Sequence, residues 1–152
     1  MIELMRHLVE RYNEEMWNQG RYQAAAEIFA ADYASDNADT PGRAVGPDGI
    51  NYYVKLFRDA LPDLHSVVHE TVAEGNRIAG RFTVTGTHTG APLLGVAPTG
   101  ARITYNGYGI FHVAEGKFSH SFVLFDRLGL LIQLGIVPQD RLQALLRASQ
   151  QK

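Results

Sequence analysis

Apolar residues in the first part of the chain recur at three- and four-residue steps, which is the period of an amphipathic helix. This pattern runs from Ile2 through Leu8 and Tyr12 to Trp17. The stretch NQGR follows directly, and its glycine, Gly20, is a typical helix C-cap. We therefore expect one N-terminal helix with a single apolar face.

Two more helices are expected before residue 62. The run YQAAAEIFA, residues 22–30, predicts a short helix, and residues 32–49 are rich in turn-forming residues and predict a loop. Pro47 is a favoured residue for the first turn of a helix. The segment DGINYYVKLFRDAL that follows predicts a third helix, which Pro62 ends.

Beyond residue 62 the chain becomes rich in valine, threonine and aromatic residues, with glycine-containing turns between the runs. Such runs predict β-strands. Four of them follow one another, at residues 64–75, 76–90, 101–116 and 117–125. The turns EGN and EGK join neighbouring runs as hairpins. The sequence thus predicts a curved antiparallel sheet.

The last two strands are apolar on both faces. One face would hold Ile103, Tyr105, Phe111, Val123 and Phe125, and the other would hold Tyr108, Ile110, Phe118, Phe122 and Leu124. A sheet of this kind needs a cover on each face. The helices can cover one face, and we expect a second copy of the chain to cover the other, as a homodimer packed sheet on sheet.

Helices followed by an antiparallel sheet are typical of an α+β fold. A chain of 152 residues without a linker or a repeat fits one domain, over residues 1–152. Helices that lie over a bent sheet leave a cone-shaped cavity between the two layers. Such a cavity is a natural pocket for a hydrophobic small molecule.

Composition and charge narrow the possible partners. The formal net charge is -2, which gives no electrostatic reason to bind nucleic acid or an anionic membrane surface. The absence of cysteine removes disulfides, thiolate catalysis and cysteine zinc sites, and it fits a reducing cytoplasm. The most apolar run, LGLLIQLGIV, is too short to span a bilayer. We expect a cytoplasmic protein that does not bind membranes.

Several runs occur in an order that is similar to a known family. They are WNQGR and AADY near the N-terminus, then GTHTGAPLLGVAPTGARI, the hairpin IFHVAEGKFSH and finally DRLGLLIQLG. Together they resemble the SnoaL-like polyketide cyclase family of the nuclear transport factor 2-like superfamily, over most of the chain. The resemblance implies the cone-shaped fold of that superfamily. It also implies a cofactor-free enzyme that closes a ring in an aromatic polyketide ester by aldol condensation.

The resemblance further implies where the cyclases hold their catalytic pair. Their aspartate would stand three residues before the Asp of DRLGLLIQLG, where this chain has Val123, and their histidine falls on Gly109. The chain therefore lacks the pair that carries the best-known reaction of the family. The same positions still predict a cavity with aromatic walls, which two glycines enlarge. Its expected wall consists of Trp17, Tyr33, Tyr105, Gly107, Gly109, Phe111, Ser121 and Val123.

Two other residues are candidates for proton transfer. Asp126 stands between two apolar runs, so it is either an acid whose pKa is raised by burial or the N-cap of the helix RLGLLIQL. His88, in GTHTG, either lies at the mouth of the cavity or holds the turn that follows it by a hydrogen bond.

The histidines do not predict a metal site. His65 and His69 are four residues apart on an expected strand, which separates them by about 13 Å. His112 and His120 flank the EGK turn on the face away from the cavity, where a dimer interface explains them better than a metal does.

Three functions remain open at this point. The first is a cofactor-free lyase or isomerase that acts on an apolar, carbonyl-bearing small molecule. In that case Asp126 or His88 would transfer the proton, and Tyr105 or Ser121 would bind the carbonyl. The second is a non-catalytic protein that binds a hydrophobic ligand, which the missing pair favours. The third is a dimeric scaffold whose cavity is incidental.

Overall fold

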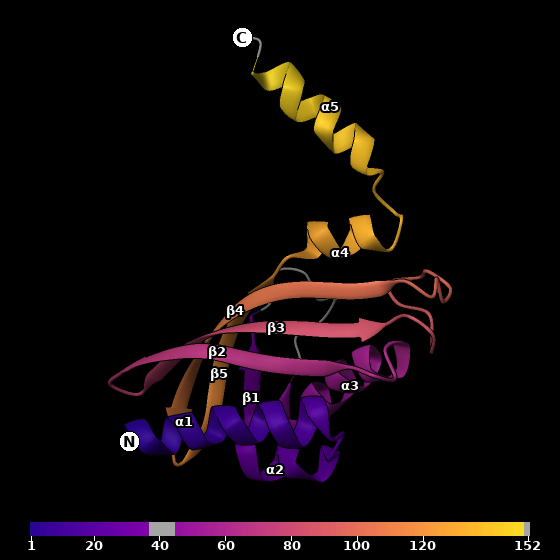
Figure 1. Ribbon diagram of the computed structural model, residues 1–152. Coiled ribbons are helices and arrows are strands. Elements are labelled where there is room, and N and C mark those ends of the chain that lie inside the picture. The colour runs from indigo at the N-terminus through magenta and orange to yellow at the C-terminus, as the bar shows by residue number, and fades with distance from the viewer. Residues whose placement is uncertain (37–44, 151–152) are drawn as a thin grey trace.

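The computed structural model describes residues 1–36 and 45–150, in which helices pack on one face of a curved sheet (Figure 1). The helical elements are α1 (Ile2–Arg11), η1 (Tyr12–Asn18), η2 (Tyr22–Ala24), α2 (Ala25–Ile28), α3 (Gly46–Ala60), α4 (Arg127–Gln133) and α5 (Gln139–Ser149). The strands are β1 (Phe29–Ser35), β2 (His65–Glu74), β3 (Arg77–Thr87), β4 (Arg102–Ala114) and β5 (Lys117–Phe125). The predicted α+β class is confirmed.

The predicted N-terminal helix is continuous but has two geometries. α1 is an α-helix, and η1 continues it as a π-helix. Gly20 follows with a φ of 69°, which glycine adopts more readily than other residues. The carboxamide of Asn18 accepts a hydrogen bond from the backbone N–H of Ser66 at 2.7 Å and donates one to its carbonyl at 3.1 Å. In this way η1 covers part of the free edge of β2.

The structure corrects the prediction for residues 29–35. These residues form β1, which pairs in parallel with β5, so the sheet is mixed, in the order β1-β5-β4-β3-β2. The segment FAADYAS has no β-branched residue. Its position comes instead from tertiary packing, because Phe29 and Tyr33 are buried and their rings pack edge to face, 4.8 Å apart. Residues 37–44 of the predicted loop lie outside the described residues.

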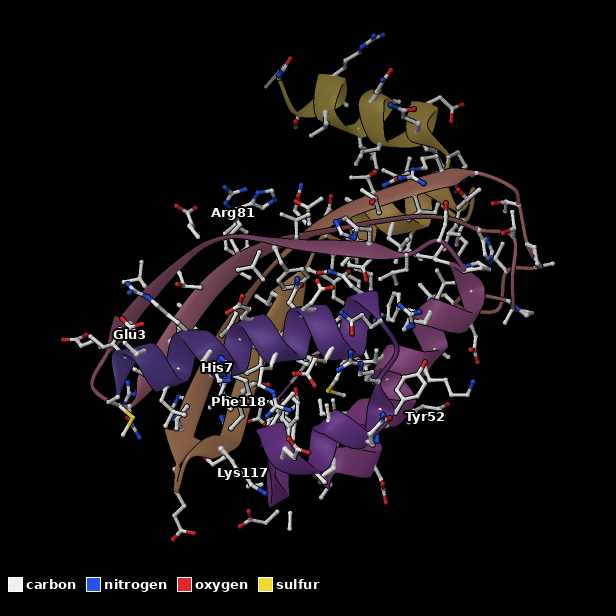
Figure 2. The ribbon with its side chains drawn as sticks, turned by 60° about the horizontal axis from the view of Figure 1, so that its bottom comes forward. Glu3, His7, Tyr52, Arg81, Lys117 and Phe118 are labelled. Atoms are coloured by element: carbon white, nitrogen blue, oxygen red, sulfur yellow. The ribbon has the colours of Figure 1, made fainter. Side chains whose placement is uncertain are left out.

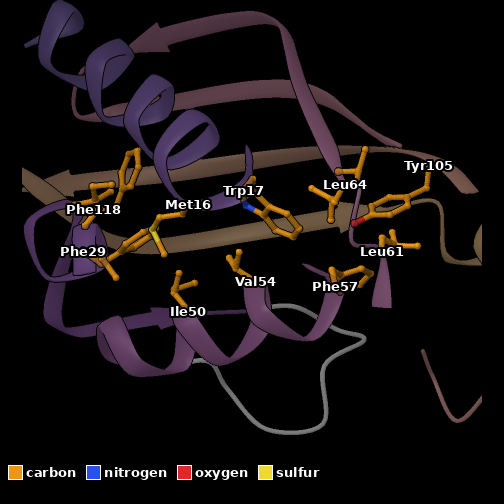
Figure 3. Packing of buried hydrophobic residues seen from close by; sticks show 14 of the residues in the cluster. Met16, Trp17, Phe29, Ile50, Val54, Phe57, Leu61, Leu64, Tyr105 and Phe118 are labelled. Atoms are coloured by element: carbon orange, nitrogen blue, oxygen red, sulfur yellow. The ribbon is translucent and has the colours of Figure 1, made fainter. Parts of the chain in front are cut away.

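The core lies between the concave face of the sheet and the helices that precede β2. Figure 3 shows Met16 and Trp17 of η1 opposite Val54 and Phe57 of α3, and all four side chains are buried. The chain continues after β5 into α4, which packs against β4, and then into α5. Within the described part of the chain, no helix is both long enough and apolar enough to cross a membrane.

One predicted strand position lies on the wrong face. Phe118 is fully buried, with its ring centroid 5.5 Å from that of Phe29 and 4.8 Å from that of Phe111. The register between β4 and β5 shifts between His112 and Val113. Because such a bulge adds one residue to one strand, it reverses the inward and outward alternation beyond it. This reversal brings Phe118 into the core.

The outer face of the sheet is apolar and exposed. Val72, Ala79, Ile110 and Phe122 are direct neighbours in one row across four strands. Val72, Ile110 and Phe122 are exposed. Arg81 lies on the same side, away from the helices (Figure 2). α5 has no buried residue and extends away from the sheet in Figure 1. The homodimer stays a prediction.

Candidate ligand-binding site

A cavity lies between the helices and the concave face of the sheet, with walls from α1, η1, β1, α3 and the four strands β2 to β5. The part of the cavity that the centre of a water molecule can reach has a volume of about 70 Å³. One water needs roughly 10–15 Å³ of such space. The cavity therefore has room for a small organic molecule, and its wall is mainly aromatic and aliphatic.

The π-helix brings two aromatic side chains to this cavity together. Tyr12 and Trp17 both line it, although they are five residues apart. In an α-helix, five residues turn the chain by about 500°, so the two side chains would point roughly 140° apart. The wider π-helical turn brings them close to one face. Their rings accordingly pack edge to face with 6.3 Å between centroids.

Four phenols line the cavity, from Tyr12, Tyr33, Tyr53 and Tyr105. Burial raises the pKa of the Tyr105 hydroxyl well above its ordinary value, and the nearby Tyr53 and Tyr12 raise it further. Burial also raises the pKa of Tyr12 and the pKa of Tyr33. These hydroxyls are therefore neutral hydrogen-bond donors at physiological pH.

Two of the polar groups in the wall are already paired with each other. The Tyr33 hydroxyl lies 2.6 Å from Oγ of Ser121, and Ser121 in turn donates to Oγ of Ser35 at 3.3 Å. All three side chains are buried. The chain of hydroxyls joins β1 to β5. A ligand would therefore have to compete with existing hydrogen bonds at Tyr33 and Ser121.

The hydroxyl of Tyr105 is differently placed. Within residues 1–36 and 45–150, no side-chain hydrogen bond links it to the rest of the protein. Its ring is held by Phe57 and Phe125, with centroids 5.7 and 5.3 Å away. Figure 3 shows the ring pointing into the core, towards Trp17. Since a phenol hydroxyl can donate one hydrogen bond and Tyr105 lines the cavity, this hydroxyl is placed to donate to an acceptor on a ligand.

The sequence of the chain matches one protein family over most of its length. Residues 7–134 match the family described as SnoaL-like polyketide cyclase. The chain belongs to the SnoaL-like polyketide cyclase family. No protein with a curated functional description matches it.

Solved structures agree with the SnoaL-like fold. TsrD from Streptomyces laurentii superposes with a TM-score of 0.80 at 24% identity, over 89% of this chain and 97% of TsrD. IdmH from Streptomyces antibioticus has a TM-score of 0.73 at 23% identity, over 86% of this chain and 97% of IdmH. A SnoaL-like polyketide cyclase from Agrobacterium tumefaciens has a TM-score of 0.71 at 16% identity, over 86% and 98%. These likenesses show the cone-shaped, nuclear transport factor 2-like fold.

The SnoaL-like fold places six of the eight predicted wall residues on the cavity, namely Trp17, Tyr33, Tyr105, Phe111, Ser121 and Val123. The two glycines differ from the prediction. A Cβ atom at Gly107 would overlap the ring of Phe82, and one at Gly109 would lie 2.8 Å from Cε2 of Phe111. Aromatic rings therefore fill the space beside both glycines, and neither glycine enlarges the cavity.

Asp126 does not lie in the cavity wall of this SnoaL-like chain. Its side chain is exposed, and its Oδ1 accepts a hydrogen bond of 2.8 Å from the backbone N–H of Gly129. Asp126 is thus the N-cap of α4. The structure supports the capping interpretation over the acid in an apolar pocket.

His88 is fully buried but also lies away from the cavity. Its Nδ1 lies 3.3 Å from the backbone nitrogen and 3.3 Å from Oγ1 of Thr99, and its Nε2 lies 3.2 Å from the carbonyl oxygen of Ala91. His88 therefore holds the loop between β3 and β4 together, as the alternative interpretation of the sequence predicts.

Sequence reasoning did not identify several wall residues, among them Tyr12, Asn13, Tyr53 and Ser66. Tyr53 could have been found, because it lies three residues after Ile50 and four before Phe57 on the apolar side of the third helix. The sequence places Tyr12 on the apolar face of the N-terminal helix, but it does not predict the π-helical geometry that turns both Tyr12 and Trp17 towards the cavity.

The described part of the cavity wall has no carboxylate, imidazole, amine or guanidinium group. Among the described residues that line it, none is Asp, Glu, His, Lys or Arg. The described residues also contain no cluster of three or more His, Cys, Asp or Glu side chains suited to a metal ion. This arrangement can exclude water, hold an apolar molecule in one conformation and donate hydrogen bonds from phenol groups.

Proposed function

We propose that this SnoaL-like protein binds an apolar small molecule that carries a carbonyl group, and that it contributes no side-chain base to the chemistry of that molecule. The observation that carries the proposal is the composition of the cavity wall. Its described ionisable groups are all phenols, and burial raises the pKa of three of them, Tyr12, Tyr33 and Tyr105.

The Tyr105 hydroxyl is the group that would bind the carbonyl. It has no hydrogen-bond partner among the described residues, whereas Tyr33 and Ser121 bind each other. In a dry site a carbonyl that accepts such a bond is favoured over a hydrocarbon of the same shape, because otherwise a buried donor stays unpaired. The aromatic wall supplies the rest of the affinity through burial of apolar surface.

The same site could accelerate a ring closure only by position and by hydrogen bonding. Holding a flexible chain folded brings its two reacting carbons together. A phenol donor aimed at the carbonyl that is attacked also stabilises the negative charge that develops on its oxygen as the new bond forms. The carbon that attacks would lose its proton to hydroxide from the solvent, and the alkoxide that forms would take a proton from water, because Asp126 and His88 are absent from the cavity.

Calorimetry with a matched pair of ligands tests the proposal. Acetylnaphthalene has the carbonyl, and ethylnaphthalene has nearly the same shape without it. We expect both to bind, with the ketone tighter by about five- to tenfold, which is the value of one hydrogen bond. Tyr105→Phe should remove that preference, and Tyr52→Phe, at an exposed residue of α3, should keep it.

Two results would overturn the proposal. One is that neither compound binds to the folded protein. The other is that the preference for the ketone survives in Tyr105→Phe.

A further inference from the structure

A second hollow, an open groove, adjoins the cavity at the edge of the sheet. It lies between α1 and η1 on one side and β2 on the other, and its volume is about 620 Å³. Val9, Asn13, Ser66 and Val68 line both the groove and the cavity. These four residues thus form a shared partition, and a molecule that extends from the cavity past them enters the groove.

One hydrogen bond joins two residues of the partition across the junction of η1 and β2. Nδ2 of Asn13 donates to the carbonyl oxygen of Ser66 at 3.1 Å. Asn18 donates to the same oxygen, also at 3.1 Å. If Asn13 turns away, the Ser66 carbonyl keeps a partner, so opening does not leave a buried acceptor unpaired. Asn13 can therefore move while Asn18 still holds the π-helix to β2.

The groove differs from the cavity in its chemistry. Its walls include two carboxylates, Glu10 and Glu14, and two groups that can be cationic, Arg6 and His65. Arg6 is already 3.5 Å from the carboxylate of Glu3. Hydrogen bonds from Asn18 and Gln19 lower the pKa of Glu14, so it stays ionised. The groove thus accepts hydrogen bonds and disfavours anions.

We propose that the groove is the second half of the ligand site and that Asn13 is its gate. The cavity holds the apolar, carbonyl-bearing end of the ligand, and the groove holds a polar extension that is neutral or cationic and donates hydrogen bonds. This inference rests on the proposed function of the cavity. It adds the shape and charge of the whole ligand and the route by which the ligand enters.

Two charged probes test the preference of the groove. They are acetylnaphthalene with a propyl-linked primary ammonium group on its far ring, and the same compound with a propyl-linked sulfonate. We expect the cationic probe to bind at least about tenfold more tightly at low salt. Glu10→Gln should reduce that ratio to about threefold. Glu115→Gln makes the same charge change at the exposed turn between β4 and β5, and it should leave the ratio as it is.

The kinetics of binding test the gate. Trp17 is the only tryptophan of the chain and lines the cavity, so its fluorescence reports the arrival of acetylnaphthalene directly. In Asn13→Ala, we expect the association and dissociation rates both to rise by about fivefold. Circular dichroism and urea unfolding establish that the variant is folded.

The outcomes separate the two proposals. If acetylnaphthalene does not bind at all, the proposed function of the cavity fails. If it binds but the charged probes bind equally, or if Asn13→Ala leaves both rates unchanged, the cavity assignment stands and the groove inference is wrong. A preference for the sulfonate would also contradict the inference.

Discussion

Gly109 and Val123 face each other directly across β4 and β5, and a Cβ atom at Gly109 would lie 3.2 Å from Cγ2 of Val123. These are the two positions at which the family resemblance places a catalytic histidine and aspartate. The fold therefore still brings the two positions together. What this chain lacks is the side chains, and Phe111 and Val123 occupy the space beside Gly109.

Val123→Asp should behave as a buried acid without a partner. Burial disfavours the charged form, so the folded-state pKa of the new carboxyl should rise above its unfolded value of about 3.9. The folded state then binds more protons, and the free energy of unfolding falls as pH rises above about 4. We expect a loss of about 2 kcal/mol near pH 8 and a smaller loss near pH 5.

Urea unfolding of the variant and the wild type at the two pH values measures this difference. The same series with Val123→Asn is the control, because asparagine is polar but does not titrate. A loss of stability that is equal at both pH values would show that the position is open to water.

The buried phenols should make the protein sensitive to alkali. The pKa values of Tyr12, Tyr33 and Tyr105 are raised in the folded state, whereas an unfolded tyrosine ionises near pH 10. The folded state therefore holds protons that the unfolded state loses, so stability falls as pH rises above about 10. Ultraviolet absorbance should show part of the tyrosinate forming only as the protein unfolds. Tyr105→Phe should make the fall in stability less steep.

Asp126→Ala should affect stability and leave binding unchanged. The substitution removes the hydrogen bond to the Gly129 N–H, and loss of an N-cap costs about 1 kcal/mol. We expect that loss in urea unfolding, and an unchanged dissociation constant for acetylnaphthalene. Asp126→Asn, which keeps a capping oxygen, should recover most of the stability. If either variant binds acetylnaphthalene tenfold more weakly, Asp126 contributes to ligand binding and the capping interpretation is incomplete.

The sequence predicted the helices as far as α4, four of the five strands and most of the inward face of the sheet, because long apolar patterns determine these, but it did not predict α5. It did not predict β1, since the conformation of Phe29 and Tyr33 depends on packing against β5 and not on local preference. Phe118 was assigned to the wrong face because one bulge reverses the alternation. Tyr12 was predicted on the apolar face of the N-terminal helix but not in the cavity wall, because the π-helix has no clear sequence signal.

We also propose that the outer face of the sheet joins two copies of the chain. The apolar row through Ile110 and Phe122 is exposed, and burying such a row is favourable. Ile110→Glu should therefore shift a dimer to a monomer in sedimentation equilibrium. Tyr52→Glu adds the same charge on the exposed side of α3 and should leave the dimer intact. A wild-type protein that is monomeric at high concentration would contradict the proposal.

The central claim is that the cavity binds a carbonyl compound but supplies no base to it. Proton NMR of acetylnaphthalene in heavy water, with the protein present, measures both parts at once. The account predicts that the ligand signals broaden on binding, while the methyl protons beside the carbonyl exchange no faster than in buffer. Rapid exchange of those protons, saturable in ligand and lost on unfolding the protein, would contradict it.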